Sequence, residues 1–196
     1  MGVIWDLCSG LGGFSEAFAQ AGWTVIRIDN SKLVQHVPFT LDLDVRQWAD
    51  WADDLPKPDV IVASPPCVEF SNGFHGPRPT ALREGIHFEP DMSIVIACRD
   101  IIETFKPKYW VIENVAGAIK FFQEEIGFWS QKIGPLFLWG NFPRIILPPD
   151  YTYTKAGQDV WSTDPLRANK KAYIPFEVSF HLLYGIKTQR TLEEYI

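Results

Sequence analysis

Short apolar runs alternate with segments of helical periodicity along the first two thirds of the chain. Four runs rich in Val, Ile and Trp have the length of buried strands, and they cover residues 3–8, 23–29, 59–62 and 109–112. Helices are predicted at residues 14–20, 91–105 and 116–125. Strands that alternate with helices predict an α/β fold built on a parallel sheet.

The remaining segments are rich in turn residues. Residues 71–90 hold three Gly- or Pro-rich patches and predict a long loop, of the kind that is usually functional or disordered. Residues 143–149 are Pro-rich and residues 150–170 are polar with scattered Tyr and Trp, so both are expected to be loops. A closing helix is expected from Ile174, with Pro175 in its first turn. The chain has no internal repeat, and its 196 residues fit one domain.

Polar residues follow the first two predicted strands. The turn Ser9-Gly10-Leu11-Gly12-Gly13 has three glycines in four positions, which lets the backbone approach a ligand at the amino end of the next helix. Asp29 ends the second strand 23 residues after Asp6, and dinucleotide-binding folds place a ribose-binding acid about 20 residues on. A solvated carboxylate is the alternative for Asp29. Asp42 and Asp44 have two interpretations as well, because each could accept a hydrogen bond from an adenine amino group or cap a helix.

Two reactive side chains follow the other two predicted strands. Cys67 comes after Pro65 and Pro66, which fix the backbone and supply no amide donors, so the chain leaves the sheet stiffly at its carboxyl edge. That edge is where open α/β sheets bind ligands. Glu113 is delivered to the same edge, where a carboxylate beside apolar walls can hold a proton for donation. The alternatives are a buried structural cysteine and a helix-capping glutamate.

Composition limits the cell compartment and the partners. Three widely spaced cysteines predict a reducing compartment, with neither a disulfide framework nor a zinc cluster. No signal peptide or membrane span is expected, so the prediction is a cytoplasmic protein without membrane contact. The net charge of −6 has the wrong sign for neutralising many phosphates, so any contact with nucleic acid must be local.

Three runs, in this order and spacing, carry a family resemblance: residues 6–14, Ser64-Pro65-Pro66-Cys67 and Glu113-Asn114-Val115. The chain resembles the cytosine carbon-5 methyltransferases over residues 3 to about 140, and residues 172–175 look like a degraded form of the family's final motif. The resemblance implies a doubly wound, Rossmann-like sheet that binds S-adenosylmethionine, in a single domain over residues 1–196. It implies these cofactor-binding residues: Asp6, Cys8, Ser9, Gly10, Leu11, Gly12, Gly13, Asp29, Asn30, Asp44, Val45, Pro66 and Ile94.

The resemblance also implies how the thiol and the carboxyl group work together. Carbon 5 of cytosine is a poor nucleophile, so Cys67 first adds to carbon 6, while Glu113 protonates or hydrogen-bonds ring nitrogen 3. The expected substrate is DNA, either single-stranded or with the target base flipped out of the duplex, which costs a few kcal/mol. The predicted substrate-binding residues are Ser71, Arg78, Arg83, Asn114, Gln131 and Lys132.

The chain departs from the family pattern at several positions. Cys8 and Asn30 stand where the family often has aromatic contacts to adenine, and Ala172 stands at the Asn of the final motif. The stretch matching Gln-x-Arg-x-Arg is residues 131–135, which keeps Gln131 but lacks both arginines that help to hold the base. Lys132 or Arg144 is a candidate substitute.

The region that recognises the target sequence is predicted to be short. Only about thirty residues lie between Gly140 and Ala172, and readout of a base sequence needs a substantial surface. We therefore expect relaxed or short sequence specificity, or a partner that supplies recognition. The expected segments are an active-site loop at 71–90 that carries His75, a reduced recognition region at 141–171 and a closing helix at 172–196.

Two alternatives remain open from the sequence. The same chemistry on RNA or on a free cytosine nucleotide is favoured by the acidic charge and the reduced recognition region. A catalytically degenerate subunit that binds nucleic acid for another protein is favoured by the missing arginines. That second alternative does not account for the presence of both Cys67 and Glu113.

Overall fold

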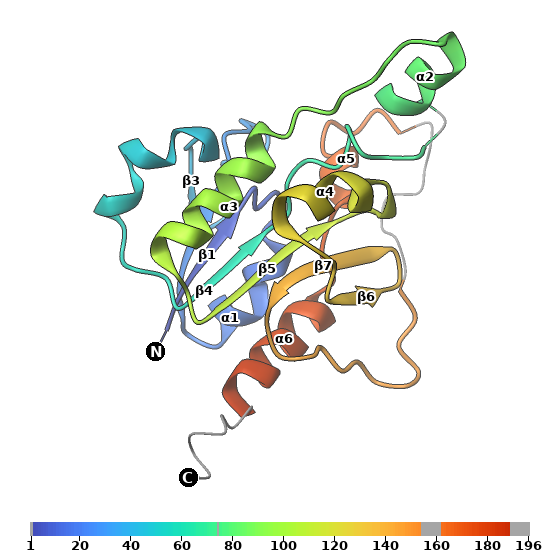
Figure 1. Ribbon diagram of the computed structural model, residues 1–196. Coiled ribbons are helices and arrows are strands. Elements are labelled where there is room, and N and C mark those ends of the chain that lie inside the picture. Colours follow the sequence, from blue (N-terminus) through green and yellow to red (C-terminus); the bar gives the residue numbers. More distant parts are fainter. Residues whose placement is uncertain (1, 74, 154–161, 189–196) are drawn as a thin grey trace.

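The computed structural model describes residues 2–73, 75–153 and 162–188, and one seven-stranded sheet runs through it (Figure 1). The sheet has the order β3-β2-β1-β4-β5-β7-β6. The first five strands in this order are parallel, whereas β7 runs antiparallel to both β5 and β6. The strands are β1 (Val3–Leu7), β2 (Thr24–Ile28), β3 (Thr40–Leu41), β4 (Val60–Ala63), β5 (Tyr109–Asn114), β6 (Gln131–Ile133) and β7 (Leu136–Asn141).

Helices cover both faces of the sheet, which confirms the predicted doubly wound arrangement. One face packs against α3 (Ser93–Phe105) and α4 (Ile119–Ile126), and the other packs against α1 (Glu16–Gln20) and α6 (Phe176–Thr188). The side chains of β4 alternate between these two cores, because Ile61 lies in the first core and Val60 in the second. A central strand buried on both faces explains why its sequence is apolar throughout.

All four predicted strands are confirmed, and β5 extends further than expected, so that Glu113 and Asn114 are its last two residues. The prediction of an uninterrupted loop at 71–90 is wrong, because α2 (Pro77–Glu84) forms inside it. Proline is tolerated in the first turn of a helix, where its missing amide has no partner to lose, and Gly85 ends α2 with a φ of 68°. No residue of α2 is buried, and the helix projects from the body of the molecule (Figure 1).

The prediction that residues 150–170 lack secondary structure is also wrong. A short helix, α5 (Arg167–Lys171), begins inside this segment, while residues 154–161 lie outside the described part of the chain. The closing helix α6 begins one residue after Pro175, as the proline predicted, and residues 189–196 are not described. Within the described ranges, no helix has both the length and the apolar character needed to cross a bilayer.

A buried arginine joins the glycine turn to β2. Arg27 is 1% exposed, and its Nε donates to Ser15 Oγ at 2.9 Å, while Nη2 donates to the Gly12 carbonyl at 3.0 Å and to Glu16 at 2.9 Å. Ser15 Oγ in turn donates to the carboxylate of Asp6 at 2.6 Å. A buried charge needs such complete pairing to be tolerated, so this network holds the turn and the start of α1 in one position.

Gly12 serves this network by leaving room for the guanidinium group. It has a φ of 75°, and an added Cβ would lie 2.5 Å from the guanidinium carbon of Arg27. Gly85 has a similar φ of 68° but open space around it. The pair therefore separates backbone strain, which both positions share, from steric overlap, which only Gly12 has.

We predict that Gly12→Ala lowers the free energy of unfolding by about 1–3 kcal/mol more than Gly85→Ala does, because the buried guanidinium cannot move aside. Urea unfolding of the two variants and the unmodified protein measures the difference. Equal losses in the two variants would show that Arg27 relaxes freely and that only the backbone conformation matters.

Candidate active site

The parallel register brings the ends of four strands to one level. Leu7 of β1 pairs with Ile28 of β2 and with Ala63 of β4, and Ala63 pairs with Ile112 of β5. The residues that come next are therefore Cys8, Asp29, Ser64 and Glu113, all at the carboxyl edge of the sheet. This is the edge where open α/β sheets bind ligands.

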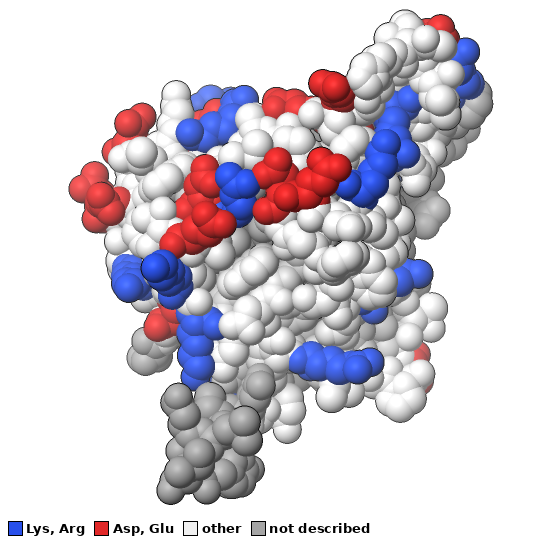
Figure 2. All heavy atoms as spheres, viewed as in Figure 1, with Lys and Arg blue, Asp and Glu red and all other residues white. Residues whose placement is uncertain are grey.

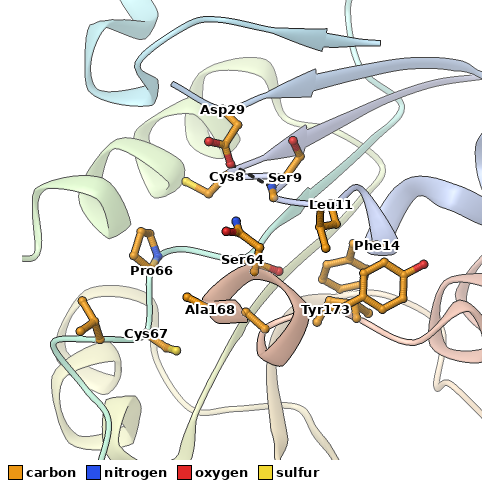
Figure 3. Close-up of a pocket in the computed structure, with 16 residues that line it drawn as sticks. Cys8, Ser9, Leu11, Phe14, Asp29, Ser64, Pro66, Cys67, Ala168 and Tyr173 are labelled. Atoms are coloured by element: carbon orange, nitrogen blue, oxygen red, sulfur yellow. Dashed lines mark hydrogen bonds between the residues drawn. The ribbon is translucent and has the colours of Figure 1, made fainter. Parts of the chain in front are cut away.

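The first cavity at this edge, which we call the glycine-turn cavity, has a volume of about 340 Å³ (Figure 3). Asp29 lies at one end of it and Cys67 at another, and Ala168 of α5 lies between Cys67 and Tyr173. The volume falls in the range of small-molecule sites. Its lining residues from the strand ends and the turn are Cys8, Ser9, Gly10, Leu11, Gly13, Phe14, Asp29, Ser64, Pro66, Cys67 and Val68.

Asp29 fastens the glycine turn through its carboxylate. One oxygen accepts from the Gly10 amide and the other accepts from the Ser31 amide, each at 2.9 Å. Each carboxylate oxygen can accept a second hydrogen bond, so Asp29 retains acceptor capacity toward the cavity. Ser9 Oγ and Ser64 Oγ are buried and have no hydrogen-bond partner among the described residues. Both residues line this cavity, so polar groups of a ligand would satisfy them.

The second cavity, which we call the Cys67–Glu113 cavity, has a volume of about 250 Å³. It brings together the two residues whose shared rim the sequence predicted, together with Ser71. Glu113 is 9% exposed, so its carboxyl group is largely removed from water. The two cavities adjoin, because both are lined by the same five residues: Ser64, Pro66, Cys67, Ala168 and Ala172.

Asn114 holds the proline segment that carries Cys67. Its side chain is fully buried, and Nδ2 donates to the Pro65 carbonyl at 3.0 Å while Oδ1 accepts from the Val115 amide at 2.9 Å. Prolines supply no amide donors of their own, so a carbonyl acceptor is the group that the neighbouring strand can bind. Asn114 was expected to bind substrate, but the structure gives it this internal contact and leaves it outside both cavity linings.

Six residues expected to bind the cofactor lie outside the lining of the glycine-turn cavity, and two of them belong to the Arg27 network. Asp6 bonds to Ser15, and Gly12 faces Arg27. The contacts that the structure shows for these two residues therefore lie within this network.

The other four residues are held by neighbours away from the cavity. Asn30 donates to Asp44, and Asp44 accepts from the Arg46 amide and forms an ion pair with its guanidinium at 2.5 Å. Asp44 is therefore a helix cap, which was one of its two interpretations. Val45 is buried in the core, and Ile94 packs against that core.

The residues that the sequence predicted to bind substrate lie in different parts of the molecule. Arg78 of α2 donates to Asn72 at 3.3 Å and to the Gly117 carbonyl at 3.2 Å, so it ties Asn72 to the turn that precedes α4. Arg83 donates to Thr80 on the same helix. Neither arginine lines the Cys67–Glu113 cavity.

The prediction of Gln131 and Lys132 as base-holding residues is not supported by their positions. The Gln131 amide exchanges two hydrogen bonds with the backbone of Ile145, at 2.7 and 2.9 Å. The amine of Lys132 lies 5.4 Å from the centre of the Phe137 ring. Both residues line a separate hollow together with Arg144, the other candidate substitute.

The site contains residues that were not predicted from the sequence. α5 and the segment after it contribute Ala168, Asn169, Tyr173 and Ile174 to the glycine-turn cavity. Tyr173 and Ile174 belong to the degraded final motif, which was the available signal. Tyr153 lines the Cys67–Glu113 cavity, and burial together with the nearby Glu113 carboxylate raises its pKa to about 12. Its hydroxyl therefore stays protonated at neutral pH.

The model of the C-5 cytosine-specific DNA methylase family matches residues 3–127. The chain belongs to this family. Family membership indicates S-adenosylmethionine as the cofactor. Among curated proteins, the chain is similar to the Type II methyltransferase M.AplI of Arthrospira platensis, at 30% identity over 125 residues. The match covers 60% of this chain and 32% of that protein, so this chain spans much less than the length of its relative.

The chain is also similar to solved structures of methyltransferases, at lower sequence identity than to M.AplI. One is a DNA modification methyltransferase encoded within a prophage of E. coli, with a TM-score of 0.45, 19% identity, and coverage of 64% of this chain and 35% of that chain. Another is DNMT2 of Spodoptera frugiperda, with a TM-score of 0.39, 21% identity, and coverage of 60% and 36%.

The glycine-turn cavity fits the cofactor of this C-5 methylase family. Gly10 leaves its side open, since an added Cβ would meet only Asn169 at 3.7 Å, so a ligand can approach the backbone closely. The two unpartnered serine hydroxyls and the Asp29 carboxylate supply polar groups, and Leu11 and Tyr173 supply apolar walls. This mixture suits a molecule with both a polar amino-acid end and an aromatic ring.

Asp6 makes the stability of this methylase fold depend on pH. Burial raises its pKa from the ordinary 3.8 to about 7. Between these values the folded chain holds a proton that the unfolded chain has lost, so stability falls as pH rises, by up to about 1.4 kcal/mol per pH unit. Above about pH 7 the group is ionised in both states and contributes no further slope.

We predict that Asp6→Asn removes this part of the pH dependence, because an amide does not titrate. Urea unfolding at several pH values between about 4 and 8 should give a shallower fall for the variant up to about pH 7 and parallel lines above it. Parallel lines over the whole range would show that Asp6 is already ionised in the folded protein under mildly acidic conditions.

Proposed function

We propose that this chain transfers a methyl group from S-adenosylmethionine to carbon 5 of cytosine in DNA. The observation that carries the proposal is the adjoining pair of cavities, with Cys67 in the lining of both and Glu113 in the lining of the second. A cofactor in the glycine-turn cavity and a cytosine in the Cys67–Glu113 cavity would then meet beside the thiol. Membership of the C-5 methylase family supports the same reaction.

Cys67 supplies the nucleophile. Its thiolate forms a bond to carbon 6 of the ring, and the electron pair of the C5–C6 double bond moves to give carbon 5 enamine character. After carbon 5 has gained the methyl group, a base removes the proton from carbon 5. The electrons left behind restore the C5–C6 double bond and expel the Cys67 thiolate. The cysteine is therefore regenerated in each cycle.

Glu113 supplies the acid. Addition at carbon 6 pushes negative charge toward ring nitrogen 3, and a carboxyl group on the wall of the same cavity can protonate or hydrogen-bond that atom. A proton donor of this kind contributes a factor of roughly 10²–10⁴ in rate. The low exposure of Glu113 strengthens the interaction, because little water competes with it.

The cofactor would be held by the glycine turn, with the Asp29 carboxylate toward the ribose hydroxyls and Leu11, Pro66 and Tyr173 along its apolar part. When bound, S-adenosylmethionine supplies an electrophilic methyl group. Cys8 also lines this cavity. Its hydrogen bond with Cys98 and its burial raise the pKa of the Cys8 thiol, so that this thiol stays protonated and uncharged. The two cysteines near the site thus have separate roles.

DNA would contact the protein over a limited surface. Figure 2 shows Asp and Glu side chains gathered over α3 and α4, whereas Lys and Arg side chains lie on α2 and beside it. An acidic surface repels the phosphate backbone, so DNA would approach from the side of α2 and the cavity mouth. The target base would be unstacked, either in a single strand or flipped out of a duplex.

Sequence specificity would be relaxed or short, or supplied by a partner protein. Of the segment 141–171 that stands at the recognition region, part forms α5, and α5 is used to line the two cavities. A segment of about thirty residues, part of which lines the cavities, offers a small surface for reading base edges in the major groove. RNA or a free cytosine nucleotide is the second candidate substrate, favoured by the net charge of −6.

We predict that the chain forms a covalent complex with 5-fluorocytosine, because fluorine at carbon 5 prevents the final loss of a proton and traps the Cys67 bond. Incubation with S-adenosylmethionine and 5-fluorocytosine in duplex DNA, single-stranded DNA, tRNA or the mononucleotide should give a denaturant-resistant complex with DNA. Cys67→Ala should abolish it while urea unfolding stays within about 1 kcal/mol of the unmodified protein.

Unmodified cytosine in the same oligonucleotides serves as the control, because its adduct is released. A complex that persists in Cys67→Ala would exclude Cys67 as the nucleophile. A complex with the mononucleotide alone would replace DNA by the second candidate substrate.

We predict that Glu113→Gln lowers the turnover of methyl transfer by about tenfold or more, because an amide cannot donate a carboxylic proton to nitrogen 3. Thermal unfolding and cofactor affinity should change little, since the side chains are of nearly equal size. Glu124→Gln, at an exposed position of α4, is the matched control and should leave turnover unchanged. Equal turnover in all three proteins would assign Glu113 a structural role only.

A further inference from the structure

A lysine lines the Cys67–Glu113 cavity. Lys171 is the last residue of α5, and it is half-buried. No other Lys or Arg lines this cavity among the described residues, whose lining otherwise consists of the carboxyl group, the thiol, hydroxyl groups and apolar side chains. Lys171 thus supplies the positively charged side chain among the described residues that line this cavity.

Lys171 has no hydrogen bond or ion pair within the described ranges of the chain, whereas its neighbour Lys170 is engaged. The amine of Lys170 donates to Asp164 at 2.6 Å, and its side chain is 48% exposed. The two lysines are adjacent on one helix and differ in what they face. An ammonium group that lines a cavity without a partner is available to an acceptor on a ligand.

Two other residues of the lining, Pro135 and Tyr153, offer no charge to a ligand. The Tyr153 side chain packs against Gly134. Pro135 is the position at which the resemblance to Gln-x-Arg-x-Arg would put the second arginine, and a proline side chain donates no hydrogen bond. Gln131 and Lys132 are occupied in the separate hollow.

The chemistry of cytosine limits what Lys171 can bind. With carbon 6 at Cys67 and nitrogen 3 at Glu113, the ring has a carbonyl oxygen on carbon 2 and an amino group on carbon 4, one on each side of nitrogen 3. An ammonium group donates only, so it fits the carbonyl oxygen and is excluded by the amino hydrogens. Addition at carbon 6 moves negative charge onto nitrogen 3 and this same oxygen.

We propose that Lys171 donates a hydrogen bond to the carbonyl oxygen on carbon 2 of the target cytosine, so that α5 orients the ring between Cys67 and Glu113. This inference rests on the proposed function. The contact strengthens as the oxygen gains charge, so it acts on the rate of the reaction more than on the binding of DNA. α5 is thereby a part of the substrate site as well as of the cofactor site.

The variants Lys171→Met, Lys171→Arg and Lys170→Met test the proposal in methyl-transfer assays on DNA. Lys171→Met should lower kcat by about tenfold or more and change KM by a much smaller factor, because the lost donor acts on the developing charge. Lys171→Arg should recover part of the rate, since it restores a charged donor. Lys170→Met should keep the rate of the unmodified protein.

A substrate with sulfur in place of the carbonyl oxygen, 2-thiocytosine, adds a readout that a structural role would not move. Sulfur is a weak acceptor, so the replacement should slow the unmodified protein but slow Lys171→Met by a much smaller factor, because the contact is already gone. Equal slowing in both proteins would overturn the proposal.

Three further outcomes are decisive. If Lys171→Met raises KM alone and lowers the slope of affinity against salt by about one charge, the amine binds a phosphate and the carbonyl contact is wrong. If the unmodified protein is active and Lys171→Met is equally active, the inference fails while the proposed function stands. If the unmodified protein neither methylates DNA nor forms the 5-fluorocytosine complex, the proposed function fails and this inference with it.

Discussion

The parallel register of β1, β2, β4 and β5 is the constraint on which the rest of the site depends. It aligns Leu7, Ile28, Ala63 and Ile112 at one level, so residues as distant in sequence as Cys8 and Glu113 come next at one edge of the sheet. Hydrogen bonds across the strands hold that level, and the apolar side chains on both faces make a slip of register costly, because a shift of one residue would exchange the two cores. The residues at this edge are therefore held in place by the same strands that form the core.

The turns at this edge are held by polar side chains whose function is to satisfy backbone groups. Asp29 binds the amide of the glycine turn, Asn114 binds the carbonyl of Pro65, and Arg27 binds the carbonyl of Gly12. Each contact joins a turn to a neighbouring strand. The reactive groups are thus positioned by residues that do not themselves react, which explains why residues matched by a family motif can lie outside both cavities.

The sequence predicted the strands, the doubly wound arrangement and the meeting of Cys67 with Glu113, because apolar runs and strand-end residues are local signals. It did not predict α2 or α5, since both helices are short and their sequences are rich in proline or polar residues. It left two interpretations open for Asp44, because the helix cap and the ion pair with Arg46 depend on side-chain geometry and not on spacing. Residues that line a cavity from a distant segment, such as Tyr153, gave no signal at all.

α5 contributes to both cavities although it is distant in sequence from the strands that end there. Its residue Ala168 lines the glycine-turn cavity and the Cys67–Glu113 cavity. α6, which follows α5 in the chain, is tied to the residues after the glycine turn, because Ser179 accepts from the Ala17 amide and donates to the Phe14 carbonyl. The two cavities are therefore lined both by residues at the strand ends and by a helix that lies far from those strands in the sequence.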